Sequence, residues 1–186
     1  MNISIEELTN LQQLPEQLID DSFRIDSVLV ITGTDQGIQY EVKPVPSYTK
    51  SYSEQQEDDA DDIDYSTYID HPDQKIFIAY AGNRVAGLIV LKRNWNHYGY
   101  IEDIKVDRQF RRYGIGRQLI DKAKSWAKSG GMPGLMLETQ NNNVQACRFY
   151  ESCGFVLGGF DSFVYKGFNK NKDEVALYWY FLFEED

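Results

Sequence analysis

The sequence predicts a mixed α/β or α+β fold in which helices enter the chain late. Apolar runs joined by turn residues fill most of the first half, and sustained helical spacing of apolar residues appears only after it. The chain has 186 residues, of which 42% are hydrophobic and 14% aromatic. That composition excludes a wholly disordered chain, and a chain of this length buries about two thirds of its unfolded surface. We therefore expect one domain over residues 1–186.

Strands are expected to dominate the first half. At the N-terminus, the spacing of Ile5, Leu8, Leu11 or Leu14, and Leu18 predicts one or two short amphipathic helices. Two pairs of apolar runs, each joined by turn-forming residues, predict β-hairpins, and a further strand follows them. These segments are Phe23–Ile31, Ile38–Val45, Lys75–Tyr80, Val85–Leu91 and Tyr98–Val106. Between the hairpins, residues 47–70 are expected to form an acidic surface segment with a loop and a helix.

Helices are expected in the second half, separated by short strands. Apolar residues at helical spacing predict an amphipathic helix over Gly116–Lys128, and Asn143 is well suited to begin a second helix over Asn143–Ser152 as its N-cap. The remaining apolar segments predict strands. They are Leu135–Glu138, Phe155–Leu157, Phe163–Phe168 and Val175–Phe183.

Charge is distributed unevenly along a chain whose formal net charge is −10. Residues 54–64 carry seven acids and no base, whereas residues 105–128 carry eight bases and two acids, a local charge of +6. An acidic chain is a poor partner for nucleic-acid phosphates, which require a basic face. We therefore exclude nucleic acid as a partner and expect a cationic one.

The cysteines and the apolar runs indicate a reduced, cytoplasmic protein with no metal and no membrane segment. Cys147 and Cys153 lie six residues apart in a predicted helix, where neighbours are three or four apart, so we expect no disulfide. The sequence shows no charged-then-apolar leader and no C-x-x-C or His cluster. Its longest late apolar run, Val175–Phe183, falls far short of the ~20 residues that span a bilayer.

The turn Arg111–Gly116 is the best candidate for an anion site. It joins a predicted strand to a predicted helix, whose first N–H groups attract anions. Gly114 and Gly116 allow the backbone to approach a phosphate without a Cβ in the way. No Gly-Lys-Ser/Thr follows, which excludes a Walker loop, and Leu119 stands where a Rossmann loop has its third glycine. A pyrophosphate cradle of another kind remains, and a simple tight turn is the alternative.

Two motifs together resemble the acetyl-CoA motifs of the GNAT superfamily of N-acetyltransferases. The first is Ile104-x-Val106 followed by Arg111-x-x-Gly114-x-Gly116, and the second runs from Asn143 through Phe149-Tyr150 to Gly154-Phe155. A closer similarity is to the streptothricin acetyltransferases, in residues 94–104 and 134–140 and around Lys50-Ser51-Tyr52. The resemblance implies a mostly antiparallel central sheet flanked by helices, and direct acetyl transfer to an amine through a ternary complex.

The resemblance assigns residues to acetyl-CoA, the expected co-substrate. The backbone of Ile104 and Val106 would pair with the pantetheine arm. The pyrophosphate would be held by N–H groups of Arg112–Arg117, with charge added by the side chains of Arg111, Arg112 and Arg117. The N–H groups at Gly114, Ile115 and Gly116 belong to this set. Asn143 would hydrogen-bond the pantetheine, and Tyr150 would protonate the departing thiolate. Asn143 as a mere N-cap and Tyr150 as a mere core residue are the alternatives.

Glu102 is the candidate base. An alkyl ammonium with a pKa near ~10.4 must lose a proton before it can attack. Glu102 precedes Ile104 and Val106 by two and four residues, so the period-two rule places all three on one strand face and Asp103 on the other. The alternatives are that Glu102 holds the cationic substrate or pairs with a neighbouring base. Glu138 is the second choice.

The expected acceptor is a cationic small-molecule amine, by resemblance the β-lysine amine of streptothricin, so that acetylation confers resistance. Acidic and aromatic side chains would bind it by charge and by stacking on ammonium groups. The candidates are Asp58, Asp59, Asp61, Asp62, Tyr65, Trp95, Tyr98, Glu102 and Glu138. Another amine, such as a polyamine, an aminoglycoside or a protein lysine, is the first alternative, and a non-catalytic acyl-CoA sensor is the second. The apolar segment Val175–Phe183 and family habit suggest a homodimer.

Overall fold

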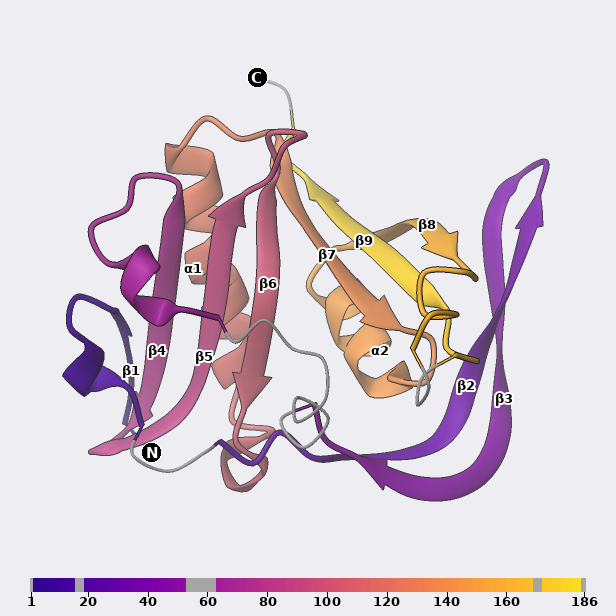
Figure 1. Cartoon of the computed structure of the whole chain (residues 1–186), viewed down its shortest axis with the longest axis horizontal. Coiled ribbons are helices and arrows are strands. Elements are labelled where there is room, and N and C mark those ends of the chain that lie inside the picture. The colour runs from indigo at the N-terminus through magenta and orange to yellow at the C-terminus, as the bar shows by residue number, and fades with distance from the viewer. Residues whose placement is uncertain (1, 16–18, 53–62, 169–171, 185–186) are drawn as a thin grey trace. The chain divides into compact units, whose positions relative to one another are not determined.

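The computed structural model describes residues 2–15, 19–52, 63–168 and 172–184. Two compact units divide the chain (Figure 1). The first unit contains Met1–Phe23 and Ser51–Leu135, and the second contains Arg24–Lys50 and Met136–Asp186. Within the described ranges, no helix is both long and apolar enough to cross a membrane. The expectation of a single domain stays a prediction.

The first unit is an antiparallel sheet covered by a helix. Its strands lie in the order β1-β4-β5-β6, and each neighbouring pair is antiparallel. They are β1 (Ile3–Glu7), β4 (Gln74–Ala81), β5 (Arg84–Arg93) and β6 (Gly99–Val106). Helix α1 (Ile115–Ser129) packs along β4, β5 and β6, behind them in Figure 1. The short 3-10 helices are η1 (Leu11–Gln13), η3 (Tyr65–Tyr68) and η4 (Arg108–Phe110).

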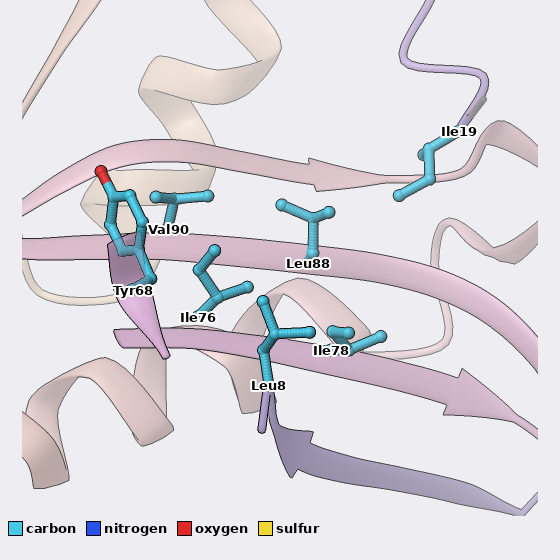
Figure 2. Close-up of a cluster of buried hydrophobic side chains, with 7 residues drawn as sticks. All are labelled: Leu8, Ile19, Tyr68, Ile76, Ile78, Leu88 and Val90. Carbon is cyan, nitrogen blue, oxygen red and sulfur yellow. The ribbon is translucent and has the colours of Figure 1, made fainter. Parts of the chain in front are cut away.

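The first unit buries apolar side chains on both sides of its sheet. On one side α1 turns its buried face inward, which includes Leu119, Ile120 and Ala123. On the other side a separate cluster packs β4 and β5 against the N-terminal segment and η3 (Figure 2). Its members are Leu8, Ile19, Tyr68, Ile76, Ile78, Leu88 and Val90. Burial of each aliphatic side chain contributes about 1.5–3 kcal/mol, so this cluster fixes η3 on the sheet.

The second unit contains a long two-stranded ribbon, a small sheet and a helix. The ribbon consists of β2 (Phe23–Thr34, whose first residue belongs to the first unit) and β3 (Gly37–Lys50). These strands follow the order β7-β9-β8, with β7 (Gly134–Gln140, whose first two residues belong to the first unit), β8 (Val156–Asp161) and β9 (Ala176–Leu182), and β8 is antiparallel to β9. Helix α2 (Val144–Ser152) begins a few residues after β7.

Most of the predicted elements are confirmed. Both hairpins, the strand that ends at Val106 and the two helices form where the sequence placed them, and the second sheet includes strands at Leu135–Glu138 and within Val175–Phe183. Cys147 and Cys153 are buried and form no disulfide with each other, as expected from their spacing. Burial raises the pKa of the Cys147 thiol to about 12, with a smaller effect from Glu151.

Two predicted elements are wrong. The N-terminal segment forms strand β1 and the single turn η1 in place of amphipathic helices, because Ile3–Glu7 pairs with β4 from Ala81 to Phe77. Residues 163–168 form turns in place of a strand. There the Asp161 carboxylate accepts from the N–H groups of Phe163 and Val164, at 2.6 and 3.1 Å, and bends the chain.

Candidate active site

The turn between β6 and α1 has the backbone geometry of an anion cradle. Arg112 and Gly114 both adopt left-handed conformations, with φ of 71° and 77°. Alternation of left-handed and ordinary residues directs successive N–H groups to one side of a turn, which is a known arrangement for binding anions. Apart from Gly114 and its two chain neighbours, no heavy atom of the described residues lies within 4 Å of the position that a Cβ on Gly114 would take. The turn is therefore open where a ligand would approach.

Helix α1 begins from this turn without a side-chain cap. Its N-cap is Gly114, which has no side chain, and the described residues make no side-chain cap hydrogen bond at this N-cap. The first N–H groups of a helix need partners, and the dipole makes them favourable for an anion. Arg112 and Arg117 are exposed beside them, and Gly116 is half-buried. This donor set fits a pyrophosphate, so the residues present fit the diphosphate of acetyl-CoA.

Arg111 binds the protein's own backbone. Its guanidinium donates to the carbonyl oxygens of Val106, Ser22 and Asp20, at 3.1, 2.7 and 3.3 Å. Burial lowers the pKa of Arg111, an effect that nearby carboxylates oppose. The side chain thus ties the turn to the N-terminal segment of the same unit. A direct contact between Arg111 and a phosphate stays a prediction.

A β-bulge at Glu102 changes the face that this residue occupies. In the β5–β6 ladder Asp103 lies opposite Val90 and Ile101 lies opposite Leu91, so Glu102 is an extra residue with no direct partner. The bulge places the Glu102 side chain among those on the face of Val90 and Lys92, with Asp103. The prediction that Glu102 shares a face with Ile104 and Val106, and that Asp103 opposes it, is therefore wrong.

The Glu102 carboxylate is bound from two sides. Lys92 donates from Nζ to Oε1, and the Tyr68 hydroxyl donates to Oε2. Lys105 pairs separately with Asp103 at 2.8 Å. Burial disfavours the charge on Lys105, but Asp103 outweighs it, so the pKa of Lys105 is raised. This face of β5 and β6 therefore carries two carboxylates and two ammonium groups in close pairs. Pairing with a neighbouring base, one of the alternatives for Glu102, is observed, and its role as the base stays a prediction.

The second acetyl-CoA motif forms the start and buried face of α2. Asn143 is its N-cap, with Oδ1 accepting from the Ala146 N–H at 3.1 Å. Asn143, Cys147 and Tyr150 follow helical spacing and are all buried, so the shared face predicted for Asn143 and Tyr150 is confirmed. The Tyr150 ring lies near Phe149 and Phe155, with centroids 5.5 and 5.9 Å away. Contacts of either residue with acetyl-CoA stay predictions.

Glu138 belongs to another hydrogen-bonded group in the second unit. The Tyr165 hydroxyl donates to its Oε1, and the Gln140 amide donates to the same hydroxyl at 2.7 Å. Glu138 and Gln140 lie two apart on β7 and share a face. The second-choice base is thus also anchored by a tyrosine, and its role toward an acceptor stays a prediction.

The other predicted acceptor-binding residues differ in where the structure places them. Trp95 is 87% exposed in the β5–β6 turn, which also contains Tyr98. Tyr65 begins η3 and packs against the cluster of Figure 2. The four aspartates Asp58, Asp59, Asp61 and Asp62 lie outside the described residues.

The sequence analysis missed three residues that bind the two candidate carboxylates, Glu102 and Glu138. They are Lys92, Tyr68 and Tyr165. Lys92 carries a weak signal, because it is the first charged residue after the apolar run of β5 and lies two positions from Val90, on the same face of the strand. Tyr68 lies in the acidic, tyrosine-rich segment, and Tyr165 lies in a segment predicted as a strand. Neither tyrosine carries a sequence signal for its partner, because each contact joins residues 27 or more positions apart.

The motifs and their geometry agree with a known family. The acetyltransferase (GNAT) family matches residues 43–155 of this chain, which covers both motifs. The chain therefore belongs to the GNAT acetyltransferases. Its fold agrees, since the helices and the mostly antiparallel strands are those that the resemblance implied.

Relatives within the family are similar over most of the chain. The Streptothricin acetyltransferase of Escherichia coli is 36% identical over 90% of this chain and 92% of its own length. Streptothricin acetyltransferase A of Bacillus subtilis (strain 168) is 40% identical over 73% of this chain and 76% of its own length. The fold is also similar to the crystal structure of a proposed streptothricin acetyltransferase from Bacillus anthracis str. Ames in complex with acetyl coenzyme A. The two sequences are 51% identical, and the structural match covers 99% of each chain with a TM-score of 0.87.

Proposed function

We propose that this GNAT acetyltransferase transfers the acetyl group of acetyl-CoA to the β-lysine amine of streptothricin, and thereby confers resistance to that antibiotic. The observation that carries the proposal is the similarity to streptothricin acetyltransferases over nearly the whole chain. The related Bacillus anthracis protein with acetyl coenzyme A supports the co-substrate.

The first unit supplies the anion cradle in this proposal. Residues Arg112–Arg117 direct N–H groups toward the pyrophosphate, and the side chains of Arg112 and Arg117 add charge to a turn that already favours anions. Ile104 and Val106, which are half-buried and lie just before the turn on β6, would pair with the pantetheine arm through their backbone. When bound, acetyl-CoA supplies an activated acetyl group as a thioester.

Carboxylates and tyrosines supply the proton chemistry. Glu102 accepts a proton from the acceptor's ammonium, which leaves a neutral amine able to attack. Tyr150 donates a proton to the departing thiolate, and Asn143 binds the pantetheine. The acidic residues 54–64, together with Tyr65, Trp95, Tyr98 and Glu138, are proposed to attract and hold the cationic acceptor. Tyr165 holds Glu138 in place for such a contact.

Turnover of purified protein with acetyl-CoA and a panel of amines tests the proposal. The panel contains streptothricin, a polyamine, an aminoglycoside and a lysine peptide, and the measurement is CoA release with mass spectrometry of each product. We expect kcat/KM for streptothricin to exceed that for the other amines at least about tenfold, since each tenfold corresponds to only about 1.4 kcal/mol of differential binding. The product should carry one acetyl group on the β-lysine amine.

Protection of a sensitive bacterium gives a second, independent measurement. Expression of the wild-type chain should raise the streptothricin concentration that the host tolerates, and expression of Tyr150→Phe at the same level should not. If another amine in the panel has a higher kcat/KM than streptothricin, that amine becomes the proposed acceptor. Tight acetyl-CoA binding with no turnover of any amine would favour the sensor alternative.

A further inference from the structure

The Glu102 carboxylate is held in place by two residues that belong to neither acetyl-CoA motif. Tyr68 donates to one carboxylate oxygen and Lys92 to the other. Each carboxylate oxygen has two lone pairs, so one lone pair on each remains for another donor. Glu102 keeps 21% of its side chain exposed, so an incoming ammonium group can reach those lone pairs.

Tyr68 is the more rigid of the two partners. It is 6% exposed and belongs to the same buried cluster as Val90 and Ile76. Figure 2 shows its hydroxyl at the end of this cluster, away from Leu8 and Ile78. Burial, helped by the hydrogen bond to Glu102, raises the pKa of the Tyr68 phenol, so the hydroxyl stays protonated near neutral pH and can donate to the carboxylate. Packing of the ring therefore fixes the position of the hydroxyl oxygen that donates to Glu102.

The residues around Tyr68 fix η3 as well. Asp64 accepts from the Ser66 N–H at 3.0 Å and from its hydroxyl at 2.6 Å, which caps η3 at its start.

Lys92 lies opposite Tyr100 in the ladder, and its Nζ is 5.6 Å from the centroid of that ring. Lys105 is paired with Asp103, so the two adjacent carboxylates of β6 have different lysine partners. Glu102 thus has its own dedicated set of donors.

We infer that Tyr68 is a positioning residue for Glu102, in an inference that rests on the proposed function. The bulge brings Glu102 onto this face, and the Tyr68 hydroxyl fixes the direction of its carboxylate. In the reaction an N–H bond of the acceptor's ammonium breaks and an O–H bond forms on Glu102, while the electron pair stays on nitrogen. That pair forms the C–N bond as the C–S bond of the thioester breaks. The thiolate takes a proton from Tyr150, and the Tyr150 phenolate regains the second proton that the new amide nitrogen releases. Glu102 then passes the first proton to solvent, so one amide, one thiol and one released proton result.

Position matters here because proton transfer requires the base within hydrogen-bond reach of the acceptor nitrogen. Displacement of a catalytic group by about 1 Å can lower a rate about 100-fold. The bulge redirects the Glu102 side chain, and its two hydrogen-bond donors then hold the carboxylate. A merely structural tyrosine, by contrast, would stabilise the fold and leave turnover unchanged.

A double-mutant cycle separates these two roles. The variants are Tyr68→Phe, Glu102→Gln and the two combined, each assayed for acceptor turnover, for acetyl-CoA affinity by calorimetry and for melting temperature. Tyr80→Phe is the matched control, because Tyr80 packs against the same cluster and its hydroxyl donates to the Gln13 carbonyl oxygen at 3.2 Å, away from Glu102. Lys92→Met is a second route to the same carboxylate that leaves the buried cluster intact.

The expected result is a loss of kcat without a loss of co-substrate binding. Tyr68→Phe should lower kcat about 10- to 100-fold and leave the acetyl-CoA Kd within about twofold, whereas Tyr80→Phe should leave both unchanged. If Tyr68 acts through Glu102, adding Tyr68→Phe to Glu102→Gln should lower kcat no further. Lys92→Met should likewise lower kcat only when Glu102 is present.

Independent losses would overturn the inference. If Tyr68→Phe multiplies the loss of Glu102→Gln, or behaves like Tyr80→Phe in turnover, Tyr68 does not position Glu102. These outcomes leave the proposed function intact, because they are measured against an active wild type. If streptothricin is not acetylated but another amine is, the proposed acceptor fails, and the same cycle with that amine still decides the role of Tyr68. A wild type that turns over no amine overturns both.

Discussion

Helices α1 and α2 begin in opposite ways. At α1 the N-cap is Gly114 in a left-handed conformation, and among the described residues no side chain caps the helix. At α2 the N-cap is Asn143, whose side chain accepts from the Ala146 N–H. Within the part of the chain that the structure describes, the first helix start therefore has no side-chain cap, whereas the second satisfies one of its N–H groups from its own sequence.

This difference suggests different roles for the two helix starts, namely ligand binding at α1 and support of the helix at α2. The open start of α1 offers backbone donors and a positive dipole end, which suits the binding of a diphosphate. The capped start of α2 instead fixes the helix that carries Tyr150 two turns further on, with its ring near Phe149 and Phe155. We therefore expect changes at α1 to act on acetyl-CoA affinity and changes on α2 to act on turnover or stability.

The largest effect is expected at Tyr150. Tyr150→Phe keeps the buried ring and removes the hydroxyl proposed to protonate the thiolate. General acid catalysis typically contributes 100-fold or more, so kcat should fall about 100-fold. Acetyl-CoA affinity should stay within about twofold, because the lost interaction develops only as charge builds on sulfur. Steady-state kinetics and calorimetry on the same preparations measure both values. Equal losses in turnover and affinity would assign Tyr150 a packing role.

The second effect is expected at Gly114. Gly114→Val forces a β-branched residue into a φ of 77° and places a side chain in the open cradle. The acetyl-CoA Kd should rise about tenfold or more because backbone approach to the phosphates is blocked. Gly131→Val is the matched control, since Gly131 lies at the other end of α1 with a φ of 64° and similar open space around it.

Both glycine variants should lose a similar 1–2 kcal/mol of stability, roughly, because a left-handed conformation costs about that much for a residue with a Cβ. Melting curves give this loss, and calorimetry gives the affinities. A higher acetyl-CoA Kd in Gly114→Val, with an unchanged Kd in Gly131→Val, supports the cradle. The same loss of affinity in both variants would mean that α1 is disturbed as a whole, and acetyl-CoA phosphates would then bind elsewhere.

The sequence analysis succeeded for the fold wherever a signal was local. The hairpin of β4 and β5 was predicted from two apolar runs with a tight turn, and α1 from apolar residues at helical spacing. β1 was missed because its strand form depends on hydrogen bonds from β4, about 70 residues away, which outweigh weak helical spacing. The turns at residues 163–168 were missed because one carboxylate, Asp161, bends an otherwise strand-like run.

In the candidate site, the contiguous motifs could be predicted from the sequence, whereas the contacts between distant residues could not. The strand, glycine turn and N-cap motifs are contiguous, so their residues could be named from the sequence. The face of Glu102 could not, because a bulge is an insertion in pairing register that leaves no mark on the alternation of residues. The Tyr68 contact also depends on how η3 packs against the sheet, which only the folded chain determines.

The smallest effect, and the sharpest test of the capped helix start, is expected at Asn143. Asn143→Ala removes both the cap and the amide, whereas Asn143→Ser keeps a capping oxygen and removes only the amide. Loss of the cap should cost Asn143→Ala about 1 kcal/mol, or roughly 2–4 °C in melting temperature, while Asn143→Ser should stay near the wild type.

Acetyl-CoA affinity then tells whether the Asn143 amide touches the ligand. A neutral hydrogen bond contributes about 0.5–1.5 kcal/mol, so both variants should weaken the Kd by roughly threefold to tenfold if the amide binds the pantetheine. Wild-type affinity in Asn143→Ser, with lower stability in Asn143→Ala, would limit Asn143 to capping. The start of α2 would then differ from that of α1 completely, because one would bind the ligand and the other would only support the helix of Tyr150.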